Sequence, residues 1–340
     1  MKAYVIKKGA SGLEALQQTN LDDPSPGPNE VVICMRAASL NYKDLMSVAP
    51  PGRGWPATRD FVPLSDGAGE IAAVGSDVKR VKVGDRVATS MFPRWVDGPP
   101  APHKLGSLGS AGHDGTLAEL LRVHEDGVAL VPPYLTLEEA STLSCAAVTA
   151  WNALFHAGGQ LKPTDTVLCM GTGGVSIFAL QFAKAAGARV IITSSSDEKL
   201  EHAKKLGADE LINYKKTPEW DKEVMKLTAG RGVDCVIELG GAGTIGKSYR
   251  SIAYCGRVQF IGVLANNEPG DTNPHPIAFR QGSINGIMVG TRTMLEKCME
   301  SMVLSKYKPV IDKIFPFDNA PDAYKYLQSG KHFGKVVISV

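Results

Sequence analysis

The sequence lacks several features that would place it in a specialised class of proteins. Its six cysteines are scattered, and no two of them lie within ten residues of each other, which excludes a CxxC-type metal or redox motif. No apolar run approaches the roughly 18 residues that a membrane span needs. The formal net charge is only +2, so the composition gives no reason to expect nucleic acid or an anionic membrane as the main partner.

Length and composition are those of an ordinary globular protein. With 340 residues, of which 44% are hydrophobic and 21% charged, the chain can form two domains and a core that needs no disulfides. The N-terminal segment MKAYVIKKGA has no apolar signal core. We interpret the scattered cysteines as free thiols in a reducing compartment, and we therefore expect a cytoplasmic protein.

The pattern of the sequence changes along the chain. Residues 1–130 contain short apolar segments bounded by Gly, Pro and Asp, which is typical of β-strands and turns. A helical segment at Thr136–Ala157 then leads into apolar strands that alternate with helices, beginning with the strand Asp165–Met170 and the helix Ile177–Ala186. This alternation predicts βαβ units around a parallel sheet, and so an α/β protein.

The first of these strands is followed by a glycine-rich turn, Gly171-Thr172-Gly173-Gly174-Val175-Ser176. Between a strand and a helix this pattern predicts a dinucleotide-binding site. Gly171 permits the tight turn, Gly173 lets the backbone approach a pyrophosphate, and the helix N-terminus offers its free N–H groups. The third position is Ser176 in place of glycine, which is small enough for close helix–strand packing. The alternative is a plain strand–helix turn.

The residues after the second strand bear on the choice of cofactor. NAD-binding proteins usually carry Asp or Glu there for the ribose hydroxyls, but here Ser194 and Ser195 follow, and Asp197 comes later as a helix cap. A carboxylate would repel a 2′-phosphate by about 3 kcal/mol at roughly 5 Å and an effective dielectric constant of about 20, so its absence favours NADP(H). Lys199 and Tyr214 are candidate contacts; the alternatives are a solvated lysine and a packing residue.

Eight motifs occur in order along the chain: ASLNYKDLM (38–46), PLSDGAGEIAAVG (63–75), VGDRVA (83–88), GTLAELLRV (115–123), SCAAVTAWNAL (144–154), GTGGVS (171–176), LGADELINY (206–214) and HFGKVVISV (332–340). Each motif alone is modest. The ordered set resembles the medium-chain dehydrogenase/reductase superfamily, and most closely its zinc-independent quinone oxidoreductase-like branch. The resemblance covers essentially the whole chain.

This resemblance implies a two-domain architecture. Residues 1–130 and 291–340 would form a β-rich GroES-like catalytic domain, and residues 131–290 a Rossmann NADP(H)-binding domain with a doubly wound parallel sheet. The active site would lie in the cleft between the domains. Gly286–Arg292 would form the sixth Rossmann strand, an edge that often pairs between subunits in relatives, so we expect a homodimer.

Zinc alcohol dehydrogenases of the superfamily bind their catalytic metal through Cys, His and Cys. By resemblance these positions correspond to Asn41, Ser65 and Cys145, so one ligand of three is present. Because catalytic zinc needs three protein ligands, we expect no metal. We interpret Cys145 as a helix residue near the nicotinamide, with a redox-sensitive thiol as the alternative.

The resemblance also implies which residues take part in the chemistry. Asn41, Tyr42 and Ser65 would lie beside the nicotinamide and donate hydrogen bonds to the acceptor, with packing as the alternative for Tyr42. Asp44 and Asp66 match positions that support the metal in zinc relatives, and we interpret them as residues that order the domain.

Further positions follow from the same resemblance. The family's cofactor contacts match Thr149, Leu239, Gly240, Ile261, Gly262, Val263, Gly334 and Lys335. Lys43 is interpreted as a surface residue or a contact to a cofactor phosphate. Arg94 and Trp95 either shape the mouth of the substrate site or lie in an exposed loop.

The predicted function is hydride transfer from NADPH to a quinone or another activated α,β-unsaturated carbonyl. Such acceptors are already electrophilic, so they need no metal to polarise them, whereas simple alcohol–ketone interconversion needs another electrophile. Two alternatives stay open: a zinc-independent alcohol dehydrogenase or aldehyde reductase, and a non-enzymatic NADPH-binding sensor.

Overall fold

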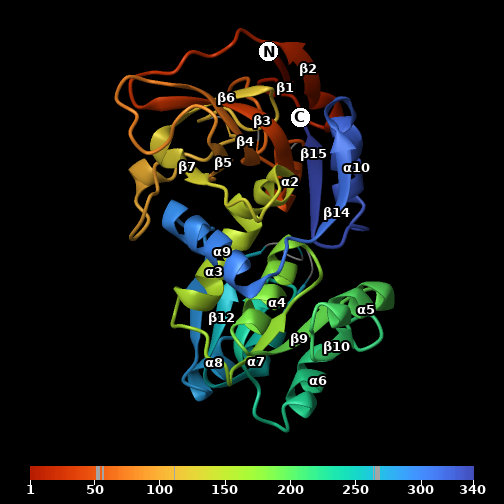
Figure 1. Cartoon of the computed structure of the whole chain (residues 1–340). Coiled ribbons are helices and arrows are strands. Elements are labelled where there is room, and N and C mark those ends of the chain that lie inside the picture. Colours follow the sequence, from red (N-terminus) through yellow and green to blue (C-terminus); the bar gives the residue numbers. More distant parts are fainter. Residues whose placement is uncertain (51–53, 56, 111, 263, 265–268) are drawn as a thin grey trace. The chain divides into compact units, whose positions relative to one another are not determined.

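The computed structural model describes residues 1–340 apart from 51–53, 56, 111, 263 and 265–268 (Figure 1). The described chain forms two compact units, one of residues 1–148 and 290–340 and the other of residues 149–289. The first division between the units thus falls 18 residues after the expected domain boundary at 130/131. Residues 131–148 belong to the first unit because their helix α2 (Leu137–Ser141) packs against the strands β3, β4 and β5 of that unit.

The second unit is a doubly wound α/β fold. Its described strands form one parallel sheet in the order β10-β9-β8-β11-β12-β13, which is the 3-2-1-4-5-6 order of a Rossmann sheet. The strands are β8 (Thr166–Cys169), β9 (Arg189–Ser194), β10 (Glu210–Asn213), β11 (Val233–Glu238), β12 (Ile252–Phe260) and β13 (Ser283–Gly286). The helices are α4 (Gly174–Ala185), α5 (Asp197–Lys205), α6 (Trp220–Leu227), α7 (Ile245–Ser251) and α8 (His275–Phe279). The predicted α/β class is confirmed.

The central strands of this sheet are buried on both faces, which is why they are nearly continuous apolar runs in the sequence. In β8 every residue is buried, and in β9 every residue after Arg189 is buried. Leu168 and Ile191 pack with Val236 and Val258 of the neighbouring strands in one core cluster.

The sixth strand differs from the prediction. It is β13, at Ser283–Gly286, and not Gly286–Arg292. Beyond Gly286 the pairing with β12 continues through a single bond, from Ile287 N to Phe260 O at 2.9 Å. Val289 then adopts a left-handed backbone conformation, with φ +48°, which an extended strand cannot contain.

The first unit is mainly antiparallel β-structure. One sheet has the order β14-β15-β3-β4-β5-β7, with β6 paired to β3, and a second, two-stranded sheet consists of β1 and β2. The strands are β1 (Lys2–Ile6), β2 (Leu16–Asn20), β3 (Glu30–Leu40), β4 (Asp66–Val74), β5 (Arg86–Thr89), β6 (Leu120–His124), β7 (Val128–Leu130), β14 (Ile311–Pro316) and β15 (Lys335–Ser339). Besides α2, the helices are α1 (Tyr42–Met46), α9 (Arg292–Ser305) and α10 (Ala320–Gln328). This agrees with the predicted β-rich GroES-like domain.

The segment predicted as one helix at Thr136–Ala157 is helical but interrupted. Thr136 caps α2, because its side chain accepts from Glu139 N at 3.1 Å. A π-helical turn at Leu143–Ala147 follows, and α3 (Val148–Phe155) continues from it. Turns of this kind occur mostly as local irregularities in α-helices and are frequent at functional sites.

No helix in the described part of the chain combines the length and the apolar character that crossing a membrane requires.

Candidate functional site

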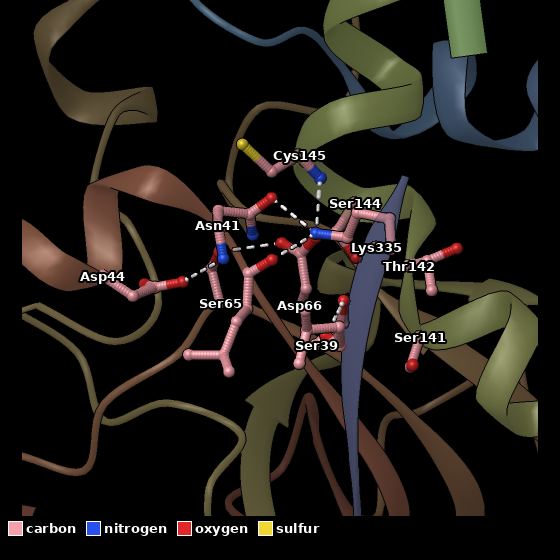
Figure 2. Close-up of polar contacts among 12 residues, drawn as sticks. Ser39, Asn41, Asp44, Ser65, Asp66, Ser141, Thr142, Ser144, Cys145 and Lys335 are labelled. Carbon is pink, nitrogen blue, oxygen red and sulfur yellow. Dashed lines mark hydrogen bonds and ion pairs between the residues drawn. The ribbon is translucent and has the colours of Figure 1, made fainter. Parts of the chain in front are cut away.

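A cluster of buried polar side chains lies where strands of the first unit begin and end (Figure 2). β15 is antiparallel to β3, with Val336 opposite Leu40. Lys335, which starts β15, is therefore beside Asn41, which follows β3. β4 is also antiparallel to β3, and its first residue is Asp66. The register of one sheet thus brings together Asn41, Asp66 and Lys335, which are far apart in the sequence.

The ammonium group of Lys335 lies at the centre of this cluster (Figure 2). The residue is only 3% exposed. Its Nζ donates to Leu40 O at 2.6 Å and to Asn41 Oδ1 at 2.7 Å, and it lies 3.7 Å from Asp66 Oδ2. An unpaired buried charge costs several kcal/mol, so these three oxygens are what makes the burial of Lys335 possible.

Asp66 is the counterion of Lys335 and is fully buried. Its Oδ1 accepts from Ser65 Oγ at 2.9 Å, and its Oδ2 accepts from Cys145 N at 3.2 Å. Burial raises the pKa of the Asp66 carboxyl, and the neighbouring Lys335 ammonium opposes that shift. The expectation that Asp66 orders the domain agrees with these contacts, since they tie three segments of the first unit together.

Ser65 directs its hydroxyl proton to Asp66. The preceding residue, Leu64, adopts φ +69°, a conformation that costs a non-glycine residue roughly 1–2 kcal/mol. The Leu64 side chain is completely buried, which offsets that strain. The Ser65 carbonyl also accepts from Thr89 Oγ1 at 2.9 Å. Ser65 therefore supports the Asp66 carboxylate here, and its role as a donor to substrate stays a prediction.

The polar atoms of Asn41 differ in how well they are hydrogen-bonded. Its backbone N donates to Asp44 Oδ2 at 2.7 Å, and its Oδ1 accepts from Lys335. The amide nitrogen, Nδ2, is buried and close enough to lower the pKa of Asp66, yet in the described part of the chain it makes no hydrogen bond of normal geometry. A buried donor without a well-formed hydrogen bond costs about 1–3 kcal/mol, and the nearby Asp66 carboxylate, whose pKa this amide lowers, offsets part of that cost.

The other residues predicted around this site differ in exposure. Tyr42 is 46% exposed at the start of α1. Lys43 is mostly buried and pairs with Asp44, Nζ to Oδ1 at 2.8 Å, which does not fit the interpretation of Lys43 as a surface residue; its contact with a cofactor phosphate stays a prediction. Arg94 is exposed, whereas Trp95 is 4% exposed and packs in the core, contrary to an exposed loop.

Cys145 contributes its backbone to the cluster and keeps its sulfur protonated. It lies in the π-helical turn Leu143–Ala147. Burial raises the pKa of its thiol to about 12, and the Asp66 carboxylate adds to the shift. Because the thiolate is the reactive and metal-binding form, a neutral thiol argues against the redox-sensitive alternative.

In the second unit, the predicted dinucleotide turn joins β8 to α4. Gly171 adopts φ +77°, which glycine permits without strain. Gly173 is the N-cap of the 12-residue α4 and brings no side chain to cap the helix, so the first N–H groups suit an anionic ligand such as a pyrophosphate. Ser176 Oγ donates to Met170 O at 2.5 Å, which fastens the helix to the strand. These residues therefore fit the phosphates of a dinucleotide.

Four of the predicted cofactor residues lie together at the end of β9. Ser194 is buried, and its Oγ lies 3.5 Å from Thr172 Oγ1 of the glycine-rich turn. Tyr214 N donates to Ser194 O at 3.0 Å, and the residue itself is 41% exposed. Ser195 is half-buried beside them. The edge of the sheet at this point therefore presents hydroxyl groups.

The residues after Ser195 correct one detail of the prediction. Ser196, and not Asp197, is the N-cap of α5, since its side chain accepts from the backbone of Lys199. Asp197 is the first residue of the helix, and its carboxylate is bound by Asn213 Nδ2 at 2.7 Å and by the ammonium of Lys216. The charge of this carboxylate is therefore compensated.

Sequence reasoning missed Glu238, the last residue of β11. It is fully buried, and its Oε1 accepts from Gly240 N at 2.7 Å, Gly241 N at 3.0 Å and Thr244 Oγ1 at 2.6 Å. Its Oε2 accepts from Ser248 Oγ. The signal was available, because a glutamate that ends a buried apolar strand needs several donors. Glu238 fixes the turn that holds the predicted contacts Leu239 and Gly240.

The remaining predicted cofactor positions lie at neighbouring strand ends of the same sheet. Ile261 N and Gly262 N both donate to Glu238 O, at 3.0 and 3.1 Å, so the end of β12 is bonded to the end of β11. Thr149 is buried at the start of the second unit. Val263 lies outside the described residues. Gly334 precedes Lys335 in the first unit and adopts φ +77°.

Comparison with known proteins agrees with this arrangement. Residues 27–133 match the model of the alcohol dehydrogenase GroES-like domain, and residues 174–304 match that of the zinc-binding dehydrogenases. The chain is 42% identical to a zinc-type alcohol dehydrogenase-like protein of Schizosaccharomyces pombe over 345 aligned positions, covering 99% of both chains.

Two solved structures are similar over the full length. One, ascribed to the alcohol dehydrogenases, is from Sinorhizobium meliloti and is 38% identical, with a TM-score of 0.87 and full coverage of both chains. Another is a quinone oxidoreductase of Pseudomonas syringae, 26% identical with a TM-score of 0.80, again with full coverage of both chains. The chain belongs to the medium-chain dehydrogenase/reductase superfamily. It is an oxidoreductase of that type, and alcohol dehydrogenase-like members of the superfamily use nicotinamide cofactors.

The family raises the question of whether the residues present fit a zinc ion. Among the described residues no group of three His, Cys, Asp or Glu side chains is arranged to hold a metal. At the expected positions, Asn41 Oδ1 already accepts from Lys335, Ser65 donates to Asp66, and the Cys145 thiol is neutral. These residues do not fit zinc.

Proposed function

We propose that this protein is a zinc-free reductase that transfers hydride from NADPH to a quinone or another activated α,β-unsaturated carbonyl. One observation carries the proposal: Asn41 and Ser65, at two positions that by family resemblance correspond to zinc ligands, bear an amide and a hydroxyl group that are hydrogen-bonded to Lys335 and Asp66. A site without a Lewis acid suits acceptors that are electrophilic before they bind. The full-length similarity to a quinone oxidoreductase supports the same substrate class.

The chemistry divides between the cofactor and the chain. A bound nicotinamide cofactor supplies the hydride. The turn Gly171–Ser176 and the N-terminus of α4 would hold its pyrophosphate. The amide group of Asn41 would donate a hydrogen bond to the acceptor's oxygen as negative charge develops there. Such a donor is typically worth about a hundredfold or more in rate when it is removed.

The preference for NADPH rests on the hydroxyl groups at the end of β9. Ser194 stands where NAD-binding proteins carry a carboxylate, and the carboxylate nearby, Asp197, is bound by Asn213 and Lys216. Ser194→Asp should therefore weaken NADPH binding about a hundredfold and change NADH binding much less, since about 3 kcal/mol of repulsion corresponds to two decades. Ser194→Ala is the matched control and should change both affinities by less than threefold.

The test of the reductase proposal is a substrate panel. Protein treated with a chelator should oxidise NADPH with quinones or enones, and should retain its rate when zinc is added back. Oxidation of NADPH with none of a broad panel of these acceptors would overturn the proposal. Equal binding of NADH and NADPH would overturn the cofactor assignment alone.

An alcohol dehydrogenase or aldehyde reductase that works without zinc is the second candidate. The relatives of S. pombe and S. meliloti, which carry alcohol dehydrogenase names, favour it. Chelated protein that reduced short-chain aldehydes faster than quinones or enones would decide for this reading.

A non-enzymatic NADPH-binding sensor is the third candidate. Ser65 is buried and donates its hydroxyl proton to Asp66, so this hydroxyl is not available to a substrate, which favours a sensor. Tight NADPH binding without turnover on either panel, aldehydes or quinones and enones, would decide for a sensor.

We also propose that the protein acts in the cytoplasm as a homodimer. The dimer is supported by the position of β13 at the edge of its sheet. Ile284 in this strand and Met288 just after it are each 43% exposed. Light scattering that gave a monomer mass at micromolar concentration would contradict the dimer.

A further inference from the structure

A cavity of about 750 Å³ lies in the first unit. Cavities that bind small molecules typically measure about 300–1,000 Å³. Among the described residues, none of those predicted for catalysis or cofactor binding lines this cavity. It lies on the less buried face of β6, and its walls come from residues 21–25, 93–94 and 112–115.

Part of the lining is apolar. Val62, Pro93 and Leu108 line the cavity and are buried, and Leu120 of β6 is half-buried beside them. A hydrocarbon group that leaves water for such a surface contributes roughly a factor of four in affinity for each buried CH₂ group. The cavity therefore suits a ligand with a short hydrocarbon portion.

Most carboxylates that line the cavity already have a cation. Asp114 Oδ1 lies 3.3 Å from Arg59 Nη1, and Glu30 Oε2 lies 3.4 Å from Arg122 Nε. Asp23 Oδ1 accepts from the amino group of the first residue at 2.7 Å. The charges within each of these pairs cancel, so the pairs give the cavity no preference for a ligand of either sign.

Arg94 is a lining residue whose charge is not cancelled in this way. It is exposed, and its guanidinium group makes no hydrogen bond or ion pair with any described residue. The same holds for the carboxylate of Asp22, which lies on the separate segment 21–25, whereas Arg94 directly follows the buried Pro93. A guanidinium group presents parallel N–H donors that match the two oxygens of a carboxylate. The apolar lining at Pro93 is therefore next to a cation that is ready to bind an anion.

We propose that this cavity binds a small organic carboxylate, with its charged end on the Arg94 guanidinium and its hydrocarbon portion on the apolar lining formed by Val62, Pro93, Leu108 and Leu120. The site is additional to those proposed for the cofactor and the acceptor. The inference does not depend on the proposed reductase function, because it concerns binding to the first unit and not turnover.

The test is isothermal titration calorimetry of the intact protein with sodium octanoate. We expect saturable binding with a Kd below about 1 mM. Acetate has the carboxylate without the chain and should bind at least about thirtyfold more weakly, because about three buried CH₂ groups are lost. Octylammonium has the same chain with the opposite charge and should bind at least about tenfold more weakly than octanoate.

Two results of these titrations would overturn the inference. One is the absence of saturable octanoate binding up to about 5 mM. The other is equal affinity for octanoate and octylammonium, which would mean that the chain adsorbs to apolar surface without recognition of its charge.

Variants of exposed side chains locate the binding site. Arg94→Ala should raise the Kd of octanoate at least about tenfold, because a hydrogen-bonded ion pair is lost. Arg94→Lys keeps the charge but not the parallel donors, so its Kd should lie between those of the wild type and Arg94→Ala. Asp22→Asn is the matched control: it removes the opposite charge from the same lining, and it should leave the Kd within about threefold or lower it.

An unchanged Kd for octanoate in Arg94→Ala would place the ligand elsewhere in the protein and overturn the inference. Because every readout is a binding constant and needs no turnover, a failure here is distinguishable from a failure of the proposed reductase function.

Discussion

The buried carboxylate of Glu238 allows a quantitative prediction about the second unit. Its Oε1 accepts three hydrogen bonds, from Gly240 N, Gly241 N and Thr244 Oγ1, at 2.6 to 3.0 Å. Glu238→Gln keeps an oxygen at this position but removes its negative charge. A hydrogen bond to a charged group contributes about 1.5–3 kcal/mol and a neutral one about 0.5–1.5 kcal/mol. Three bonds that each lose about 1 kcal/mol give an expected destabilisation of about 3 kcal/mol.

A matched control lies in the same sheet. Glu210 starts β10 and pairs with Arg189 at 2.8 Å, but both side chains are more than a third exposed. Solvent screens such a pair, so Glu210→Gln should cost at most about 1 kcal/mol. Ser248→Ala removes the single donor to Oε2 and leaves the charge, so it should fall between the two variants.

The assay is urea unfolding followed by circular dichroism. A lower midpoint with an unchanged slope would give the loss of stability directly. NADPH affinity, measured in parallel, should fall for Glu238→Gln because the turn at 239–241 is less firmly held. If Glu238→Gln and Glu210→Gln unfold within about 0.5 kcal/mol of each other, the four donors do not carry the stability that the geometry assigns to them.

Three further predictions follow from single residues. Gly334→Ala should destabilise the protein by about 1–3 kcal/mol and lower its activity. The reason is that Gly334 has φ +77° and that a Cβ there would lie 2.5 Å from Val310 O. An unchanged melting temperature would contradict this prediction. Gly171 also has a positive φ, but a Cβ there would meet no atom within 4 Å in the described structure. Gly171→Ala should therefore lower the stability of the protein by only about 1 kcal/mol. Cys145 should resist iodoacetamide at pH 8, where a pKa of about 12 leaves about one thiolate in ten thousand. The exposed Cys255 should react first in peptide mass mapping, and alkylation of Cys145 at a similar rate would refute the raised pKa.

Sequence reasoning succeeded where one local rule dominates. The alternation of apolar strands and helices gave the parallel sheet, because strands buried on both faces must be apolar throughout. The glycine-rich turn could be located because a tight turn before a helix demands particular residues. Ser176, the irregular third position, turned out to bind Met170 O, which no pattern of small residues predicts.

The sequence was less informative where packing decides. Gly286–Arg292 has the apolar residues of a strand, but the left-handed Val289 stops the pairing near Gly286. The two units divide after residue 148 because α2 packs on strands of the first unit. The composition of a short segment does not indicate which unit it packs against.

The polar cluster was predicted only in its parts. Asn41, Ser65, Asp66 and Lys335 were each identified, but the resemblance assigned Lys335 to the cofactor. The structure has its side chain inside the first unit, bonded to Asn41. Pairing of a lysine with an amide almost three hundred residues away depends on strand register, which the sequence alone does not specify.

That separation has a consequence for how the protein is made. Asn41 and Lys335 are 294 residues apart, and among the described strands β15 is the last to be synthesised. At a synthesis rate of roughly 5–20 residues per second, the nascent chain has no Lys335 for about 15 to 60 seconds after Asn41 is made. During that interval Asp66 lacks the Lys335 ammonium, so the polar cluster of the first unit is complete only after the C-terminal strand has been made. The second unit, whose residues are contiguous, has no such delay and can fold first.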